Sequence, residues 1–241
     1  MTTKNASVSP ANLEFLAQVK RDAELAGRVL RETGTLSATN TFAVAQRVPG
    51  EDKIVSTGFP GLWSNFGEVK ASLITFEGIV LHSDTDAGGG SRYARIFRER
   101  PSITTVIHVH TPFLGGWAQS HRTFPIFYVA AQRGTLSREI PQYVDRRQAE
   151  ADFILESLKK DPHLPAILEA NGGNTFWGDG VIKVSQYILL LEEAAKFQTI
   201  AESLGGSKEY GPGVLEQQWA RTGLLQAAIA ANAIQPSAPR N

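Results

Sequence analysis

The sequence predicts a single α/β domain, built either as an α+β fold or as a three-layer α/β/α sandwich. Three observations lead to this fold class. The 241 residues suit one domain, and neither an internal repeat nor a linker divides them. Hydrophobic residues make up 42% of the chain, which is enough for a sizeable core. Segments of helical and of strand character are mixed along the chain without strict alternation.

Composition excludes several classes of site. Lys plus Arg and Asp plus Glu each number 24, so the net charge is zero, which does not favour binding to nucleic acid or anionic membranes. The absence of cysteine excludes disulfides, Cys-ligated zinc, iron–sulfur clusters and thiol nucleophiles. No run approaches the roughly 20 apolar residues of a membrane span, and residues 1–10 lack the apolar stretch of a secretory signal. We therefore expect a cytoplasmic protein.

The amino-terminal half begins with a predicted disordered lead, residues 1–10, and the domain is expected to cover residues 11–231. Apolar residues at helical spacing predict a first helix, which stops at Gly34. A region rich in Thr, Ser and Gly follows, with short β-type runs at 41–45, 53–56, 71–75 and 78–81. Three consecutive glycines then indicate a turn.

The second half contains the clearest strand of the chain, residues 104–110. An Asn-Gly-Gly sequence predicts a hairpin between the runs 166–170 and 175–177. The remaining predicted elements are a strand at 126–131, helices at 93–99, 112–120, 146–160, 184–204 and 214–231, and a flexible tail at 232–241.

His108-Val-His110 ends the predicted strand 104–110. Side chains at i and i+2 of a strand point to the same face, about 6.5–7 Å apart at their Cα atoms. Two imidazoles at this separation can converge on one metal ion. A His-x-His sequence is often purely structural, and two histidines alone hold a metal weakly, so the motif by itself is only suggestive.

The surrounding sequence resembles the class II aldolase/adducin family. The likeness begins with a helix, an Arg-Pro pair and a strand ending in His-x-His, within residues 97–112. Other landmarks follow the family's order over residues 12–206: Gly34-Thr-Leu-Ser37, Ser56-Thr-Gly58, Pro125-Ile126, Ile140-Pro141, residues 167–173 before Trp177-Gly178, and residues 191–198. The resemblance implies a three-layer α/β/α sandwich with a mainly antiparallel sheet. It also implies a homo-oligomer, usually a tetramer with its site between subunits.

The resemblance also implies a metal site, from which this chain departs. In the family, three histidines and a glutamate surround a divalent metal ion. His108 and His110 match two of the histidines, whereas the third aligns with Gly172 and the glutamate aligns near Gly89. The family's phosphate-binding serines fall at positions 87 and 88, which are Ala and Gly. A sugar-phosphate aldolase mechanism is therefore not expected, and the metal, Zn, Mn or Fe, stays undetermined.

Other residues are candidates to complete the site. Glu169 is a candidate ligand or catalytic group, but alternation around the hairpin predicts that it faces away unless the turn is irregular. Asn174 is expected on the nearer face, where it could offer an amide oxygen. His82, Asp84 and Asp86 end the strand before the glycine loop and could also reach the site.

A small acidic substrate is the expected ligand. Backbone N–H groups at Gly89 could face a carboxylate. Arg92 and Arg95 could pair with it in bidentate fashion. Tyr128 and Arg133 are expected to line the same cleft, with Tyr128 as a candidate catalytic residue.

Three functions remain open. The first is a metal-dependent carbon–carbon lyase, an aldolase or decarboxylase, acting on a small non-phosphorylated carboxylate or aromatic acid. The second is a non-haem Fe(II) oxygenase acting on an aryl keto acid, which requires a carboxylate beside the two histidines. The third is a non-catalytic, adducin-like module for binding or assembly. The missing histidine and glutamate support this third function.

Overall fold

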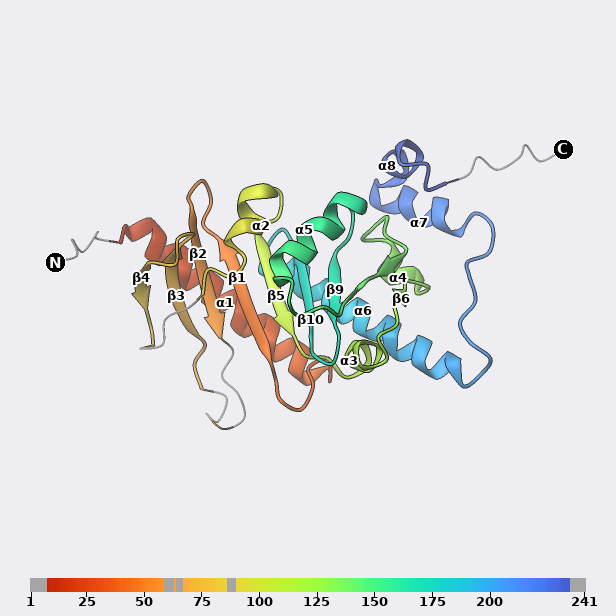
Figure 1. Ribbon diagram of the computed structural model, residues 1–241, viewed down its shortest axis with the longest axis horizontal. Helices are drawn as coiled ribbons and strands as arrows, with labels where there is room; N and C mark the ends of the chain where they lie inside the picture. The colour runs from red at the N-terminus through yellow and green to blue at the C-terminus, as the bar shows by residue number, and fades with distance from the viewer. Residues whose placement is uncertain (1–7, 59–62, 64–66, 86–89, 235–241) are drawn as a thin grey trace.

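The computed structural model describes residues 8–58, 63, 67–85 and 90–234, and its centre is an eight-stranded sheet (Figure 1). The strand order is β4-β3-β2-β1-β5-β10-β9-β8, and all neighbours are antiparallel except β8 and β9. The strands are β1 (Phe42–Arg47), β2 (Lys53–Gly58), β3 (Lys70–Thr75), β4 (Val80–Ser83), β5 (Thr105–Val109), β8 (Gln142–Tyr143), β9 (Ala166–Glu169) and β10 (Asn174–Gly178).

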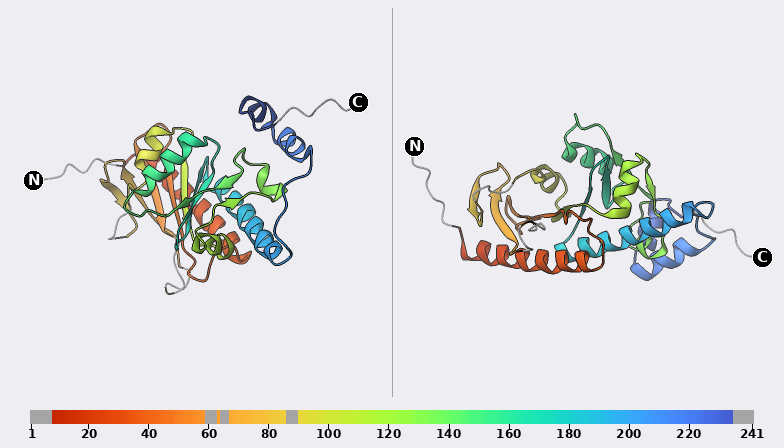
Figure 2. Two further views of the ribbon diagram at one scale, coloured as in Figure 1. Left: turned by 45° about the vertical axis from the view of Figure 1, so that its right-hand side comes forward. Right: turned by 90° about the horizontal axis from the view of Figure 1, so that it is seen from below.

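Helices cover both faces of this sheet. On one face, α1 (Pro10–Glu32) packs on β1 to β3, and α6 (Val181–Glu202) packs on β5 and β10 and against α3 (Pro112–Gln119). On the other face, α2 (Ala94–Glu99) contacts α5 (Glu150–Lys160). The right-hand view of Figure 2 shows α1 and α6 on one side of the strands and α2 and α5 on the other. The predicted three-layer sandwich with a mainly antiparallel sheet is therefore confirmed.

A smaller unit extends from one end of the sheet. It contains the short pair β6 (Phe124–Pro125) and β7 (Glu139–Ile140), and the helices α4 (Val129–Gln132), α7 (Val214–Thr222) and α8 (Leu225–Ala230). The Trp219 side chain is fully buried there, and its indole N–H donates to the carbonyls of Gln132 and Thr135. These contacts hold the carboxy-terminal helices against the loop after α4.

Several predicted element boundaries were wrong. The predicted strand 126–131 is replaced by β6 and α4, because the fully buried Gln132 amide donates to the carbonyls of Thr135 and Ser137 and holds this segment as a folded loop. The predicted helix 146–160 begins only at Glu150. The predicted helix 214–231 divides at Gly223, whose φ of 74° is left-handed. No helix in the described segments is both long and apolar enough to cross a membrane.

Candidate functional site

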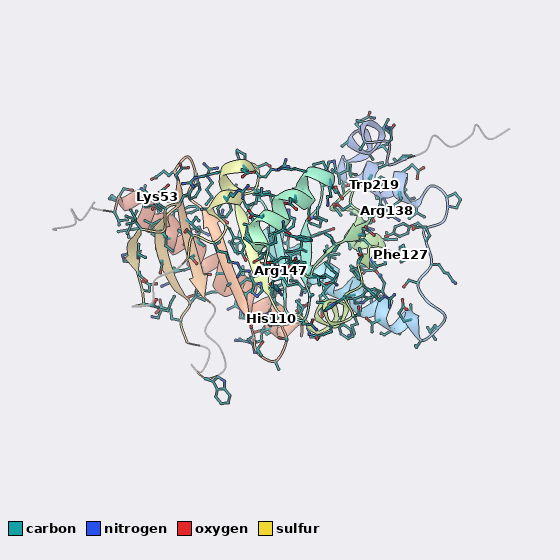
Figure 3. The ribbon with its side chains drawn as sticks, in the orientation of Figure 1. Lys53, His110, Phe127, Arg138, Arg147 and Trp219 are labelled. Carbon is teal, nitrogen blue, oxygen red and sulfur yellow. The ribbon has the colours of Figure 1, made fainter. Side chains whose placement is uncertain are left out.

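The two predicted metal histidines lie at the centre of the sheet. His108 is on β5, between Ala43 of β1 and Thr175 of β10. His110 follows the end of β5, and its backbone is fixed because its N–H donates to the Thr41 carbonyl and its carbonyl accepts from Ser37. The two imidazole rings lie 5.2 Å apart between centroids and meet edge to face. Figure 3 labels His110, which is lower in that view than the helices α2 and α5 labelled in Figure 1.

Glu169 joins this pair through a buried network. Its Oε1 lies 2.7 Å from His108 Nδ1 and accepts a hydrogen bond of 2.8 Å from the Thr175 hydroxyl. Its Oε2 accepts a bond of 2.9 Å from Arg146. Burial by itself would raise the pKa of Glu169, but the bonds from His108, Arg146 and Thr175 outweigh it and lower the pKa to about 2. Glu169 is therefore an ionised carboxylate, and His108 Nε2 points away from it.

His110 differs from His108 in its environment. Burial lowers the pKa of His110, and the nearby His108 lowers it further, while Glu169 opposes this shift. Both effects favour the neutral imidazole, which is the form that can bind a metal ion.

The β9–β10 hairpin makes room for these side chains with two glycines. A Cβ at Gly173 would lie 2.4 Å from His110 Cδ2 and 2.6 Å from the Val109 carbonyl oxygen. A Cβ at Gly172 would lie 2.9 Å from a guanidinium nitrogen of Arg146. His110 and Arg146 therefore occupy positions that larger residues in the hairpin would block.

A second layer of polar groups lies next to Thr175. The Tyr93 hydroxyl donates to Glu150 Oε1 at 3.3 Å, and Glu150 also pairs with Arg92. Burial raises the pKa of Tyr93 to about 12, opposed by the charge of Arg92 and by a hydrogen bond with Thr175. Because Thr175 also bonds Glu169, the network extends from Arg92 to His108.

Comparison with known proteins identifies this fold and its histidine strand. The family profile described as Class II Aldolase and Adducin N-terminal domain matches residues 16–199. The chain belongs to the class II aldolase and adducin family. Members of this family are in general metal-dependent lyases and are commonly oligomeric. No curated protein sequence matches at a significant level.

Solved class II aldolase structures share the fold at low sequence identity. An L-fuculose 1-phosphate aldolase is 15% identical with a TM-score of 0.67, covering 86% of this chain and 97% of its own. The L-fuculose 1-phosphate aldolase from Glaciozyma antarctica PI12 is 16% identical with a TM-score of 0.67, covering 93% and 92%. An aldolase II superfamily protein from Pseudomonas syringae is 18% identical with a TM-score of 0.67, covering 94% and 92%. These likenesses concern the fold alone.

Gly172 is the position that the sequence resemblance predicts to align with the family's third histidine. In the structure, the Arg146 guanidinium takes up the space in front of Gly172. The sequence offered no local indication of this, because Arg146 lies in the loop between β8 and α5 and reaches Glu169 only in the folded chain.

The predicted orientations of Glu169 and Asn174 were wrong. Glu169 faces His108, whereas Asn174 is fully buried on the α6 face and donates to the Thr111 hydroxyl at 3.1 Å. The loop 170–172 is closed by the bonds Gly172 N–H to Glu169 O and Glu169 N–H to Gly173 O. Its three residues keep the alternation continuous, so Glu169 shares a face with Thr175, which pairs with His108. The prediction failed because it took the face of the site from Gly172, which lies in the loop and not in a strand. Thr175 was missed in the sequence, because its position opposite His108 is set by the pairing of β10 with β5 in the folded sheet.

The other nominated residues lie in several places. Tyr128 donates to Glu193 on α6 at 2.8 Å, and Arg133 donates to Gln218 on α7 at 2.6 Å, so the structure does not bring either beside His108. Arg95 pairs with Glu99 and Asp152.

Arg92 follows the glycine loop, whereas the nominated residues His82, Asp84 and Asp86 precede it. Arg92 is connected to the site through Glu150, Tyr93 and Thr175. His82 Nε2 lies 3.6 Å from Asp84 Oδ1. The other oxygen of Asp84 pairs with Lys20 Nζ at 2.9 Å. Gly89 and Asp86 lie outside the described residues.

The family implies a divalent metal ion, and the residues around His108 and His110 decide whether one could bind here. Within the described segments, no group of three or more His, Cys, Asp or Glu residues is arranged to hold a metal ion. His108 and His110 nevertheless have the arrangement of a two-histidine centre, with Glu169 as the carboxylate that orients one ligand. The chemistry of these residues fits a divalent ion that the two imidazoles would hold together.

Proposed function

We propose that this protein is a carbon–carbon lyase, an aldolase or decarboxylase, that acts on a small non-phosphorylated carboxylate or aromatic acid. Family membership supports a lyase. The observation that carries the proposal is the His108–His110 pair, with His108 oriented by the buried Glu169 carboxylate. A divalent ion, Zn, Mn or Fe, would be held by these two histidines. When bound, it supplies Lewis-acid polarisation of substrate oxygens.

The residues of the chain have separate parts in this proposal. Glu169 is a positioning residue, since it holds the proton on His108 Nδ1 and leaves Nε2 as the ligand atom. Its pKa of about 2 and its three partners argue against a role in proton transfer near neutral pH. Arg146 and Thr175 fix the Glu169 carboxylate. Tyr128 stays a predicted catalytic residue, and Arg92, Arg95, Arg133 and Gly89 stay predicted substrate-binding residues, whereas the buried Asn174 faces away from His108 and leaves this set.

We further propose that the protein is a cytoplasmic homo-oligomer, a tetramer as the family resemblance implies. Supporting this assembly, three large apolar side chains near the end of α6 are exposed: Phe197, Ile200 and Leu204. Large apolar side chains that are exposed close together in the chain are consistent with a subunit contact.

One alternative function has a specific observation in its favour. The described residues supply no third His or carboxylate ligand, which favours a non-catalytic module for binding or assembly. The Fe(II) oxygenase is less well supported, because Glu169, the nearby carboxylate, already serves His108, Thr175 and Arg146.

Metal content tests the proposal. The wild type and the variants are loaded with Zn, Mn or Fe(II), dialysed, and measured by elemental analysis. We expect about one ion per chain in the wild type and its loss in His108→Ala/His110→Ala. His121→Ala is the matched control, because His121 is exposed and its ring nitrogen forms a hydrogen bond with Asn171. A wild type that retains no ion under any loading condition would refute the metal-dependent lyase and leave the binding module.

A further inference from the structure

Arg146 is held firmly beside the two histidines. One guanidinium NH2 group donates to Glu169 Oε2 at 2.9 Å, and the other donates to the Ala170 carbonyl at 3.1 Å. The guanidinium also lies over the Tyr143 ring, 4.7 Å from its centroid. The side chain is nevertheless 46% exposed. A guanidinium with five N–H donors therefore keeps donors for a ligand while its position is fixed in advance.

The position of Arg146 couples it to the histidine pair. Glu169 accepts from Arg146 on one oxygen and lies within hydrogen-bond distance of His108 on the other, so a single carboxylate links the guanidinium to the imidazole. The absence of a side chain at Gly172 lets the guanidinium lie over the hairpin backbone. A ligand held by Arg146 would therefore lie next to the two-histidine centre.

The charges at this point favour an anion. In the described part of the chain, Glu169 is the carboxylate that pairs with both His108 and Arg146. One negative charge therefore faces one arginine, and a divalent ion held by the two neutral imidazoles would add two positive charges. Arg95 differs, because it has two carboxylate partners, Glu99 and Asp152.

We propose that Arg146 binds the carboxylate of the substrate and selects an acid as the ligand of this site. The planar fork of arginine matches a carboxylate in bidentate geometry, which lysine cannot reproduce. The proposal deepens the proposed function and rests on it, because it takes the ligand of the histidine centre to be an acid. It assigns the substrate-binding role to a residue in the loop before α5.

Binding of simple acids tests this assignment without the reaction. Benzoate and pyruvate are titrated into the full-length protein, both EDTA-treated and zinc-loaded, and binding is followed by NMR shifts of the histidine ring protons. Benzamide and pyruvamide serve as neutral counterparts. We expect at least one acid to bind the wild type more tightly than its amide. Arg146→Gln should weaken its binding about tenfold or more, the range expected for a lost hydrogen bond to a charged group.

Two further variants keep the test sharp. Arg146→Lys retains a partner for Glu169 and guards against misfolding, yet it should also weaken acid binding, because the fork is lost. Arg147→Gln is the matched control, since Arg147 is 91% exposed and pairs with Asp145. It should leave acid binding unchanged.

The outcomes separate this inference from the proposed function. Acid binding that depends on Arg146 in a protein that retains no metal supports the inference while the metal-dependent lyase fails. Metal retention with acid binding that neither Arg146 variant weakens overturns the inference and leaves the lyase intact. Failure of both acids to bind the wild type more tightly than their amides also overturns the inference.

Discussion

Replacement of Gly173 by alanine should disturb the fold and the histidine site together. Gly173 precedes β10, next to the end of β5, and an added Cβ would lie 2.6 Å from the Val109 carbonyl oxygen. It would also lie 2.4 Å from Cδ2 of His110. Both distances are well below the 3.4 Å at which ordinary van der Waals contact begins.

The size of the effect follows from which atoms must move. The imidazole can rotate away, but the Val109 carbonyl belongs to a central strand bonded on both sides. Overpacking of this kind typically costs about 1–3 kcal/mol. We therefore expect Gly173→Ala to lower the free energy of unfolding by about this amount and to displace His110 from its position beside His108.

Urea denaturation and metal content measure the two parts of this prediction. Gly115→Ala is the control, because Gly115 lies in α3 with nothing within 4 Å of the added Cβ, and alanine should stabilise a helix interior by about 0.5–1 kcal/mol. If Gly173→Ala matched the wild type in both unfolding free energy and retained metal, the close packing of His110 on the hairpin would be refuted.

Two other predictions concern the supports around the site. Glu192 on α6 caps α3, because its carboxylate accepts the N–H groups of Phe113 and Leu114 at 2.6 and 2.9 Å. Glu192→Ala should therefore lower the free energy of unfolding, measured by urea denaturation, by about 0.5–2 kcal/mol. A loss no larger than that of the exposed Glu193→Ala would contradict this capping role. Trp219→Ala should cost about 3–5 kcal/mol of local stability. Limited proteolysis should then cut residues 205–213 faster than in the wild type, and equal cleavage rates would contradict the role of Trp219 as the anchor of α7 and α8.

Local patterns were sufficient for most of the fold. Helical spacing predicted α1 and α6, and the Asn-Gly-Gly sequence predicted the hairpin that joins β9 to β10. One failure fell where a buried side chain bonds the backbone of its own loop. The segment after β6 has strand-like residues, yet the buried Gln132 side chain bonds carbonyls across its own loop. Such a contact leaves no periodic trace in the sequence.

The candidate site was predicted in part for the same reason. Alternation along one strand placed His108 and His110 on a common face, and the structure has their rings 5.2 Å apart. Alternation was not enough for Glu169, because the face of the site was inferred from Gly172 in the hairpin loop, and only the pairing of Thr175 with His108 shows which face holds the site.

By itself, the sequence determined the helices, the main strands and the histidine pair, because each depends on residues close together in the chain, and the order of the family landmarks then indicated the three-layer class. Only the tertiary structure decided what surrounds that pair. Arg146, Glu169 and Thr175 come from a loop and two strands, and they meet at His108 because the sheet places β9 and β10 beside β5. The space in front of Gly172 is filled by an arginine 26 positions earlier in the chain, a packing relation that no spacing of residues encodes.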